Sequence, residues 1–193
     1  MKKLLETFEA LKQKNLSIDL TRGKPHSSQL DLSNDLMTQA VDPIGENGVD
    51  LRNYGEPLGI IEARKLGADI LDSKIDLTIA GEQSSYLLMT QLLLGRFLFG
   101  IDDDPWKDDK EPAFICAVPG FDRHFATLEG LGLKMHTVNL CSSGIDLDDL
   151  NKKLSKYQNI KGLICVPRHS NPSGEVFSDE NITNLLKITK AVS

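Results

Sequence analysis

The sequence predicts an α/β fold with a mostly parallel sheet, and three features indicate it. Short apolar runs of strand length alternate along the chain with longer segments of helical character. The runs are nearly continuous rather than alternating, as in Ala113 to Val118, which is typical of strands covered on both faces. No internal repeat or low-complexity tract interrupts this order. Together these features predict part of a three-layer α/β/α architecture.

Composition and charge argue against several classes of protein. The 193 residues suggest one domain, or one domain plus part of another. With 22 Lys and Arg against 28 Asp and Glu, the net charge of -6 offers no basic footprint for nucleic acid or for an anionic membrane. Glu6 and Glu9 interrupt the first apolar residues, so we expect no secretory signal. No apolar run reaches the roughly 20 residues that span a bilayer.

Cysteine usage favours a cytoplasmic protein. Three scattered cysteines, Cys116, Cys141 and Cys165, do not suggest a disulfide framework. Cys116 and Cys165 sit inside apolar runs, and we expect them to be small buried side chains.

The elements follow from periodicity and turn signals. An amphipathic helix is expected over residues 1–15, a turn-rich segment over 17–50, and a helix over 58–71 with three apolar side chains facing inward (Ile61, Leu66 and Ile70). Four strands are expected at 77–80, 113–118, 134–140 and 161–166. Helices are expected at 83–99, 122–131, 146–157 and 178–191, the first of them buried because apolar residues cover nearly every face. Ser178 is expected to cap the last helix, with Asn181 near the capping-box position.

A charged loop is expected over residues 102–112. Its aspartates could attract a metal ion, but nothing in their spacing fixes a coordination geometry, so a solvated loop is favoured and no metal site is predicted.

Ligands of open α/β sheets bind beyond the carboxyl ends of the strands, and this rule selects three loops. The first holds Gly81, Ser84 and Ser85 at the start of a helix, where hydroxyl and backbone N–H groups could bind a phosphate. A simple N-cap explains this loop equally well.

The second loop runs from Pro119 to Phe125. Phe121 could stack on a flat ring and Arg123 could pair with a carboxylate. Taken alone, an ordinary helix entry is favoured, with Asp122 near the helix dipole and both phenylalanines packed inward.

The third loop, residues 166–174, holds Asn171 between prolines and before a glycine. A rigid amide donor there suits recognition of a ring oxygen, and a structural turn is the alternative. If the strands are parallel, all three loops lie at one edge, so a composite site for a phosphate and a ring accounts for all of them.

These segments resemble a known family. The matching stretches appear in the family's order and spacing from about Leu20 onward: Leu20 to Pro25, Leu32-Ser33-Asn34, Arg52 to Gly55, Ala80 to Ser85, Val118 to Phe125, Val166-Pro167, and Asn171-Pro172-Ser173-Gly174. The chain resembles the N-terminal portion of class I/II pyridoxal-phosphate-dependent aminotransferases of fold type I. Within them it is similar to the aspartate aminotransferase-like or MocR-type catalytic domains that lack a DNA-binding module.

The resemblance implies an organisation and a set of roles. Residues 1–50 would be a helix and arm of the small domain, and 51–193 part of the large cofactor-binding domain. Ser84 and Ser85, with Gln83 beside them, would hold the phosphate of pyridoxal 5'-phosphate. Phe121 would stack on the pyridine ring and Asn171 would bond its 3-oxygen. In a homodimer, Tyr54 would reach the partner's cofactor phosphate. The substrate would meet Gly23 and Arg123.

The activity implied is transamination between an amino acid, with aspartate or glutamate favoured, and a 2-oxo acid. The cofactor would act as electron sink, a lysine as its covalent partner and general base, and an aspartate would keep the ring nitrogen protonated. No residue here matches that lysine or that aspartate, so we expect no catalytic residue in this chain and an inactive fragment. The Ser-Lys pairs lie in polar stretches and look like surface residues (Ser73-Lys74 and Ser155-Lys156). Two positions depart from the subgroup: Gln83 replaces Asn, and Phe121 replaces Tyr or Trp.

Several alternatives stay open. Another fold type I reaction, such as β-elimination or decarboxylation, would share the cofactor loops. A truncated or split-gene product would be non-catalytic. A dinucleotide-binding domain would need Gly-x-Gly-x-x-Gly after the first strand, which Gly81-Glu82-Gln83 does not provide. A MocR-type regulator would need a basic helix-turn-helix, which residues 1–50 do not supply. With fewer strands than a complete large domain, the fragment is expected to be poorly soluble or to dimerise.

Overall fold

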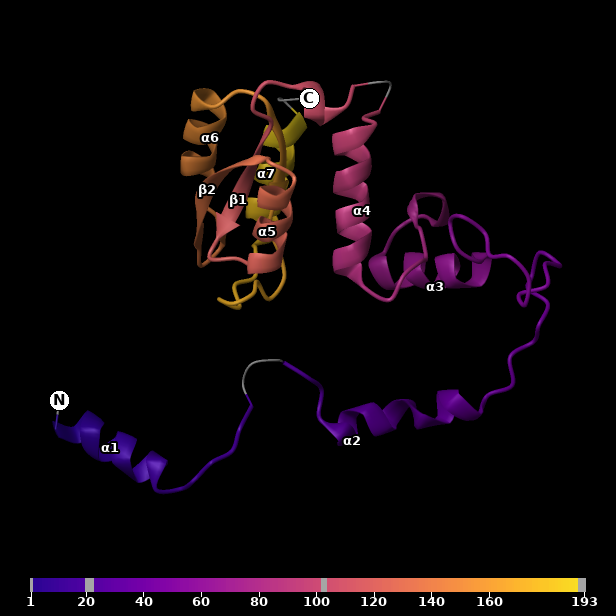
Figure 1. Ribbon diagram of the computed structural model, residues 1–193, viewed down its shortest axis with the longest axis horizontal. Helices are drawn as coiled ribbons and strands as arrows, with labels where there is room; N and C mark the ends of the chain where they lie inside the picture. The colour runs from indigo at the N-terminus through magenta and orange to yellow at the C-terminus, as the bar shows by residue number, and fades with distance from the viewer. Residues whose placement is uncertain (1, 20–22, 102–103, 191–193) are drawn as a thin grey trace. The chain divides into compact units, whose positions relative to one another are not determined.

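The structure is a computed structural model that describes residues 2–19, 23–101 and 104–190 (Figure 1). Part of the Leu20 to Pro25 motif therefore lies outside the described residues. The chain divides into two compact units, Met1–Thr78 and Ile79–Ser193, which are taken separately below. The expected domain boundary at residue 50 stays a prediction.

The first unit is mainly helical. It contains α1 (Lys2–Lys12), α2 (Ser27–Leu30), η1 (Asp31–Thr38), α3 (Ile61–Leu71) and η2 (Ile75–Leu77). The N-terminal helix is confirmed, and every described side chain on it is exposed. The turn-rich prediction for 17–50 is wrong in part, because α2 and η1 occupy its centre. His26 starts α2 as a capping box: its side chain accepts from Ser28 N, and its own N–H donates to Gln29 Oε1.

Helix α3 is confirmed, but its packed face is not the expected one. Leu66 and Ile70 are 61% and 74% exposed, whereas Ala68 is buried. Arg64 holds the helix to the segment after it by donating to the carbonyls of Ile75 at 2.8 Å and Thr78 at 2.9 Å. Small side chains and a long polar one face that segment, so the apolar periodicity pointed to the wrong side.

The second unit contains the sheet. Its elements are α4 (Ser85–Leu98), η3 (Trp106–Asp108), β1 (Ala113–Val118), α5 (Asp122–Gly130), β2 (Lys134–Cys141), β3 (Gly144–Ile145), α6 (Leu147–Lys156), β4 (Ile160–Ile164) and α7 (Asp179–Lys190). The strand order is β3-β2-β1-β4. β1 pairs in parallel with β2 and β4, and only β3 is antiparallel. The predicted α/β fold with a mostly parallel sheet is confirmed.

The strand expected at 77–80 is wrong. Leu77 ends η2, and Leu77 and Ile79 are 77% and 62% exposed. A strand forms only when a neighbour pairs with its backbone groups, and no described strand pairs with this segment. A different fourth strand, β3, replaces it: two residues that turn back against the end of β2.

Two apolar clusters cover the two faces of β1. Ile115 and Ala117 pack with residues of β2, β3, α6, α7 and the segment before α7 (Val138, Ile145, Leu150, Leu185 and Phe177). Phe114 and Cys116 pack on the other face with residues of η3, α5, the turn after α5 and the end of β4 (Trp106, Leu128, Leu133 and Ile164). Since successive side chains of a strand point to opposite faces, this division produces three layers.

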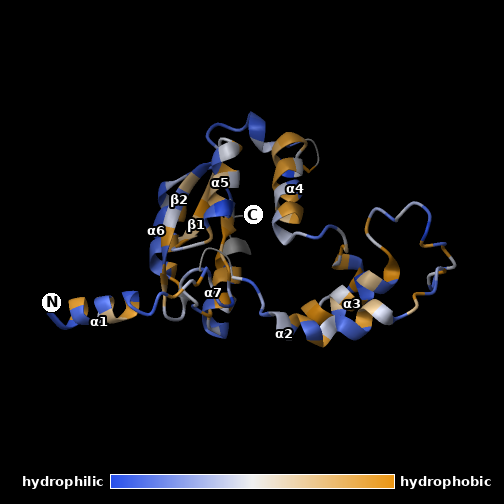
Figure 2. Cartoon of the chain, turned by 60° about the horizontal axis from the view of Figure 1, so that its bottom comes forward, coloured by the Kyte–Doolittle hydropathy of each residue, from blue (hydrophilic) through white to orange (hydrophobic). Residues whose placement is uncertain are grey.

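Helix α4 is not buried as expected. None of its residues is buried, and Leu92 is 68% exposed. Figure 2 shows the helix mostly in the hydrophobic colour, with smaller pale and hydrophilic parts. Leu93 and Phe97 pack against the cluster around Trp106, so the described residues cover one stripe of the helix. The expected shortage of cover for this helix is confirmed.

The charged loop is also more structured than expected. Trp106 is only 7% exposed and belongs to the core, with Arg96 stacked over its ring at 5.2 Å. Lys161 Nζ lies 2.6 Å from Asp109 Oδ2, and both side chains are largely buried. The solvated-loop prediction is therefore wrong for this part, while Asp102 and Asp103 lie outside the described residues. Among described residues, no three His, Cys, Asp or Glu side chains are grouped as a metal site would need.

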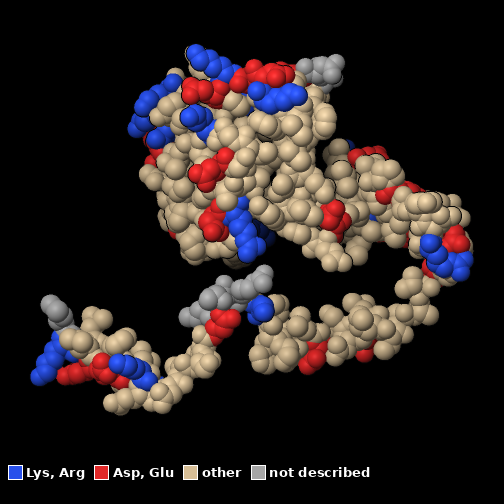
Figure 3. Space-filling model, viewed as in Figure 1, with Lys and Arg blue, Asp and Glu red and all other residues tan. Residues whose placement is uncertain are grey.

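The remaining expectations concern the surface and the thiols. Within the described ranges, no helix has the length and apolar character that crossing a bilayer demands. Figure 3 shows acidic and basic atoms interspersed over the face in view. Both Ser-Lys pairs are exposed, as expected. Cys116 is buried, and burial raises the pKa of its thiol to about 11. Cys165 is half-buried rather than fully buried, and Cys141 is exposed.

Candidate functional site

Two of the three predicted loops meet at one edge of the sheet. β1 and β4 run parallel, and their pairing extends as far as Cys116 and Ile164. The Phe121 loop, residues 119–125, and the Asn171 loop, residues 165–177, therefore both leave the carboxyl edge. The Ser84 loop, residues 81–85, follows no described strand, so sheet topology does not account for its position.

The Ser84 loop forms the N-terminus of α4. Ser84 Oγ accepts from Leu87 N at 3.3 Å, and the Ser84 carbonyl begins the helical ladder. Glu82 turns back toward the helix, with its carboxylate accepting from Gln91 Nε2 at 3.1 Å. The N-cap interpretation is therefore right for Ser84. Ser85 and Gln83 are exposed at the positive end of a 14-residue helix, where N–H groups favour an anion.

Tyr86 brings this helix start against α5. Its hydroxyl lies 2.7 Å from Thr127 Oγ1, and its ring stacks with His124 at 6.4 Å and 14°. Because Thr127 Oγ1 donates its one hydrogen to the carbonyl of Arg123, Tyr86 is the donor to Thr127. The residue after Ser85 thus ties the start of α4 to α5, the helix that follows the loop containing Phe121.

Sequence reasoning did not select Tyr86. The available signal was a single phenol at the start of a mostly apolar helix, because a half-buried Tyr hydroxyl usually has a hydrogen-bond partner.

Phe121 is the residue just before α5, and the side chains of His124 and Arg123 pack against its ring. The ring of His124 meets it edge-on at 5.2 Å and 86°, and the guanidinium of Arg123 lies 5.6 Å from its centroid. Phe121 is half-buried and stands outside both core clusters, whereas Phe125 packs against the Trp106 cluster. The helix-entry interpretation therefore holds for Phe125, and the ring of Phe121 stays partly accessible. Asp122 lies in the first turn of α5, as expected.

Gly120 allows the chain to turn at this point. A Cβ there would lie 2.6 Å from Phe125 Cζ and 2.8 Å from the carbonyl oxygen of Ala117. Any larger residue would push the Phe121 loop away from the end of β1.

The Asn171 loop is a closed turn. Phe177 N donates to the Pro167 carbonyl at 2.8 Å and Ser170 N to the Glu175 carbonyl at 2.9 Å. Asn171 is exposed at its tip, and Ser170 just before it is 4% exposed. Within the described residues the Asn171 amide has no hydrogen-bond partner, so it is available to a ligand.

Gly23 and Tyr54 belong to the first unit, whereas these loops belong to the second. Tyr54 is 95% exposed, and Gly23 has open space where a Cβ would be. Beside Tyr54, Arg52 Nη2 lies 2.7 Å from Asp50 Oδ2. Hydrogen bonds from the Arg52 side chain and backbone lower the pKa of the Asp50 carboxyl. The roles expected of Gly23 and Tyr54 stay predictions.

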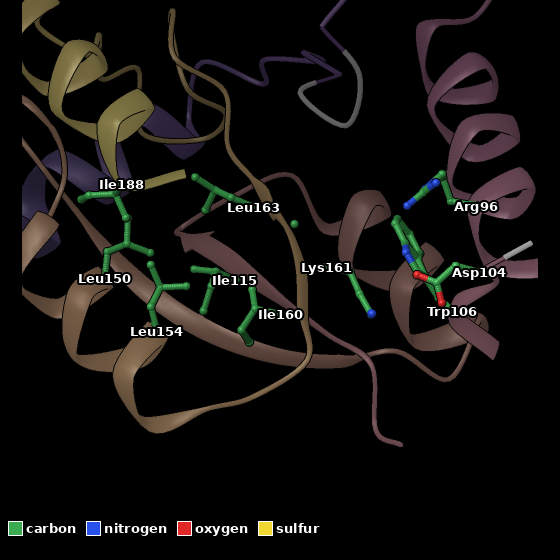
Figure 4. A pocket seen from close by; sticks show the side chains of 11 residues that line it. Arg96, Asp104, Trp106, Ile115, Leu150, Leu154, Ile160, Lys161, Leu163 and Ile188 are labelled. Carbon is green, nitrogen blue, oxygen red and sulfur yellow. The ribbon is translucent and has the colours of Figure 1, made fainter. Parts of the chain in front are cut away.

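A cavity lies elsewhere in the second unit. A space of about 500 Å³ flanks the amino-terminal half of β4, between apolar side chains of the sheet unit and Arg96, Trp106 and Lys161 (Figure 4). Arg96 Nη1 is buried there without a hydrogen-bond partner. No loop of the carboxyl edge lines this space, so its size does not make it the candidate site.

The carboxyl-edge residues suit a phosphorylated aromatic ligand. Exposed groups at the start of α4 suit a phosphate, the accessible face of Phe121 suits a ring, and the amide of Asn171 suits a ring oxygen. None of the three loops contains a lysine.

Comparison with known proteins gives consistent matches. A family model described as aspartate amino-transferase matches residues 1–193. An aspartate aminotransferase of Corynebacterium glutamicum is 38% identical over 179 residues, covering 90% of this chain and 41% of that protein. The solved structure of an aspartate transaminase from Corynebacterium glutamicum superposes with a TM-score of 0.83 at 36% identity, covering 95% of this chain and 44% of that one.

A more distant structure shares the fold. The α-aminoadipate aminotransferase of Thermus thermophilus, solved with N-(5'-phosphopyridoxyl)-L-leucine, has a TM-score of 0.56 at 19% identity and covers 72% of this chain and 33% of that one. The chain spans less than half the length of each of these relatives.

Proposed function

The chain belongs to the aspartate amino-transferase family, and we propose that it supplies the cofactor cradle of a pyridoxal-phosphate-dependent aminotransferase. Its fold is that of the fold type I enzymes, as predicted. The observation that carries the proposal is the Tyr86–Thr127 contact, because it joins the Ser84 loop to the Phe121 loop at the sheet edge that also bears Asn171.

Each loop would hold a different part of pyridoxal 5'-phosphate. Ser84, Ser85 and Gln83 would bind the phosphate at the N-terminus of α4, where the helix dipole and unpaired N–H groups favour a dianion. Phe121 would stack on the ring, and Asn171 would donate its amide N–H to the 3-oxygen. The relative from Thermus thermophilus was solved with a phosphopyridoxyl amino acid, which supports this choice of cofactor.

The chain's own residues would orient the cofactor and exclude water from it. Phe121 presents an apolar face, and His124 and Arg123 keep its ring in place by packing against its edge and face. When bound, the cofactor supplies the electron sink for reactions at the α-carbon of an amino acid.

The finer assignments are proposed from the resemblance. The amino donor would be aspartate or glutamate and the acceptor a 2-oxo acid, with Arg123 and Gly23 near substrate carboxylates. The naming of the 38% identical relative as an aspartate aminotransferase supports the donor. The enzyme would belong to the MocR-type-like subgroup, act in the cytoplasm and form a homodimer, with the 95% exposed Tyr54 reaching the partner's site.

This chain alone would bind the cofactor without a covalent bond and would be inactive. The three loops hold no lysine, and the Lys161 ammonium is engaged with Asp109 at 2.6 Å. The proposed roles are therefore binding and orientation.

Titration with pyridoxal phosphate tests the proposal. Binding is followed by absorbance for the chain, for Ser85→Ala and Phe121→Ala, and for the matched control Ser155→Ala, an exposed serine of α6. We expect saturable binding that the first two variants weaken by several-fold and the control leaves unchanged. Equal affinity in all four proteins would rule out the cradle. Borohydride should fix no cofactor to the chain, and a single modified lysine would show that the chain holds its own covalent partner.

A further inference from the structure

The base of the Asn171 loop is tied to the β2–β3 hairpin. Just after the bond between Phe177 N and the Pro167 carbonyl closes the loop, Ser178 N donates to the Ser143 carbonyl at 2.8 Å. In the same hairpin, Ile145 of β3 contacts the first turn of α7. The pose of the loop tip therefore depends on how α7 begins.

Asn181 makes the central contact at this junction. It is only 7% exposed, its Oδ1 accepts from Ile145 N at 3.1 Å, and its Nδ2 donates to the Ile145 carbonyl at 2.8 Å. One side-chain amide thus pairs with both backbone groups of a residue that is 1% exposed, as a neighbouring strand would. Its own N–H is held by Ser178 Oγ at 3.1 Å, which confirms the predicted cap.

The hairpin is shaped around this amide. Gly144 has φ of +132°, and a Cβ there would lie 2.3 Å from Asn181 Oδ1 and 3.0 Å from Phe177 Cγ. Glycine is therefore needed for the backbone of β3 to approach both side chains. Removing the amide would leave the N–H and carbonyl of Ile145 buried without partners, which is costly.

We propose that Asn181 is a positioning residue for the Asn171 loop: by pairing with Ile145 it fixes the base of this loop and so the pose of Asn171. This inference rests on the proposed function, in which Asn171 contacts the cofactor. It makes Asn181 important for cofactor binding without contact between Asn181 and the cofactor.

The first experiment needs no cofactor. Amide hydrogen exchange is measured on the chain, on Asn181→Ala, and on Asn184→Ala, a matched asparagine one turn along α7 whose Oδ1 meets only Lys187. We expect Asn181→Ala to speed exchange by about tenfold at Ser170, Gly174 and Phe177, while the amides of β1 keep their protection. Loop exchange equal to that of the parent chain would overturn the proposal, as would an equal effect of Asn184→Ala.

The second experiment is a double-mutant cycle on pyridoxal phosphate affinity. Asn171→Ala and Asn181→Ala should each weaken binding by about fivefold, as expected for one hydrogen bond. Because Asn181 acts through Asn171, the double variant should also be about fivefold weaker rather than about 25-fold. Additive losses would overturn the proposal. If the parent chain binds no cofactor, the proposed function fails, and the exchange measurement still decides whether Asn181 holds the loop.

A milder variant guards against loss of the fold. Ser178→Ala removes only the hydroxyl that accepts from Asn181 N at 3.1 Å, and it leaves the side-chain amide of Asn181 in place without adding a charge. We expect it to fold and to speed exchange at the same three amides by a smaller factor than Asn181→Ala. Unchanged exchange at those amides in Ser178→Ala would count against the proposal.

Discussion

The contact between Tyr86 and Thr127 joins two parts of the proposed site. Tyr86→Phe removes this hydrogen bond by deleting one oxygen atom. The ring and its stacking on His124 remain, so the change isolates the 2.7 Å hydrogen bond between α4 and α5. Tyr157→Phe is the matched control, because within the described residues the Tyr157 hydroxyl makes no hydrogen bond while its ring stacks on His136 at 3.5 Å.

The expected cost is about 1 kcal/mol. Thr127 keeps its bond to the Arg123 carbonyl at 3.0 Å, so no buried group is left without a partner, and the loss is the net value of one hydrogen bond, about 0.5–1.5 kcal/mol. In urea, with a slope of about 2 kcal/mol per molar, the unfolding midpoint should fall by about 0.5 M. The control should change the free energy of unfolding by less than about 0.5 kcal/mol.

Urea denaturation followed by circular dichroism measures this difference, and pyridoxal phosphate titration follows its consequence at the site. Tyr86→Phe should also weaken cofactor binding, because Ser85 directly precedes the residue that anchors the helix. If Tyr86→Phe and Tyr157→Phe have equal midpoints, the contact does not hold α4 against α5. If the midpoint falls while cofactor affinity stays unchanged, the contact is structural only.

Two further predictions concern the core and the thiols. Leu128 is 0% exposed, so Leu128→Ala should destabilise the fold by about 3 kcal/mol in urea denaturation, whereas Leu92→Ala, at a 68% exposed position, should cost less than about 0.5 kcal/mol; similar losses would show that the cluster around Trp106 is not the core. A thiol reacts as its thiolate, which forms as pH rises through its pKa. Burial holds the pKa of Cys116 at about 11, and hydrogen bonds with the Ser143 side chain and backbone lower that of the exposed Cys141. Native protein at pH 8 should therefore be labelled at Cys141 long before Cys116, and equal rates would contradict the burial of β1.

The structure could be predicted from the sequence where the residues of an element themselves determine its conformation. β1 is a continuous apolar run because both its faces are covered, and Ser178 caps α7 through its own hydroxyl. The parallel pairing of β1 and β4 then placed the Phe121 and Asn171 loops at one edge. These features depend on local chemistry and on a general rule of sheet topology.

Long-range contacts could not be predicted in the same way. The 77–80 segment has the composition of a strand. A strand also needs a neighbouring strand to pair with, and the periodicity of one segment does not show whether such a neighbour exists. The two residues of β3 are too few to show any period. The contact between α4 and α5 includes a hydrogen bond between Tyr86 and Thr127, which cannot be predicted from the apolar pattern of α4.

Chemical-shift mapping with pyridoxal phosphate tests the central claim most directly. An amide spectrum of the chain is recorded during titration with the cofactor, and again with inorganic phosphate. The account predicts that both ligands shift Ser85 and its neighbours at the start of α4, and that only pyridoxal phosphate also shifts Phe121 and Asn171. Shifts confined to residues around Arg96 and Lys161, or no saturable shift in any of the three loops, would contradict the cofactor cradle.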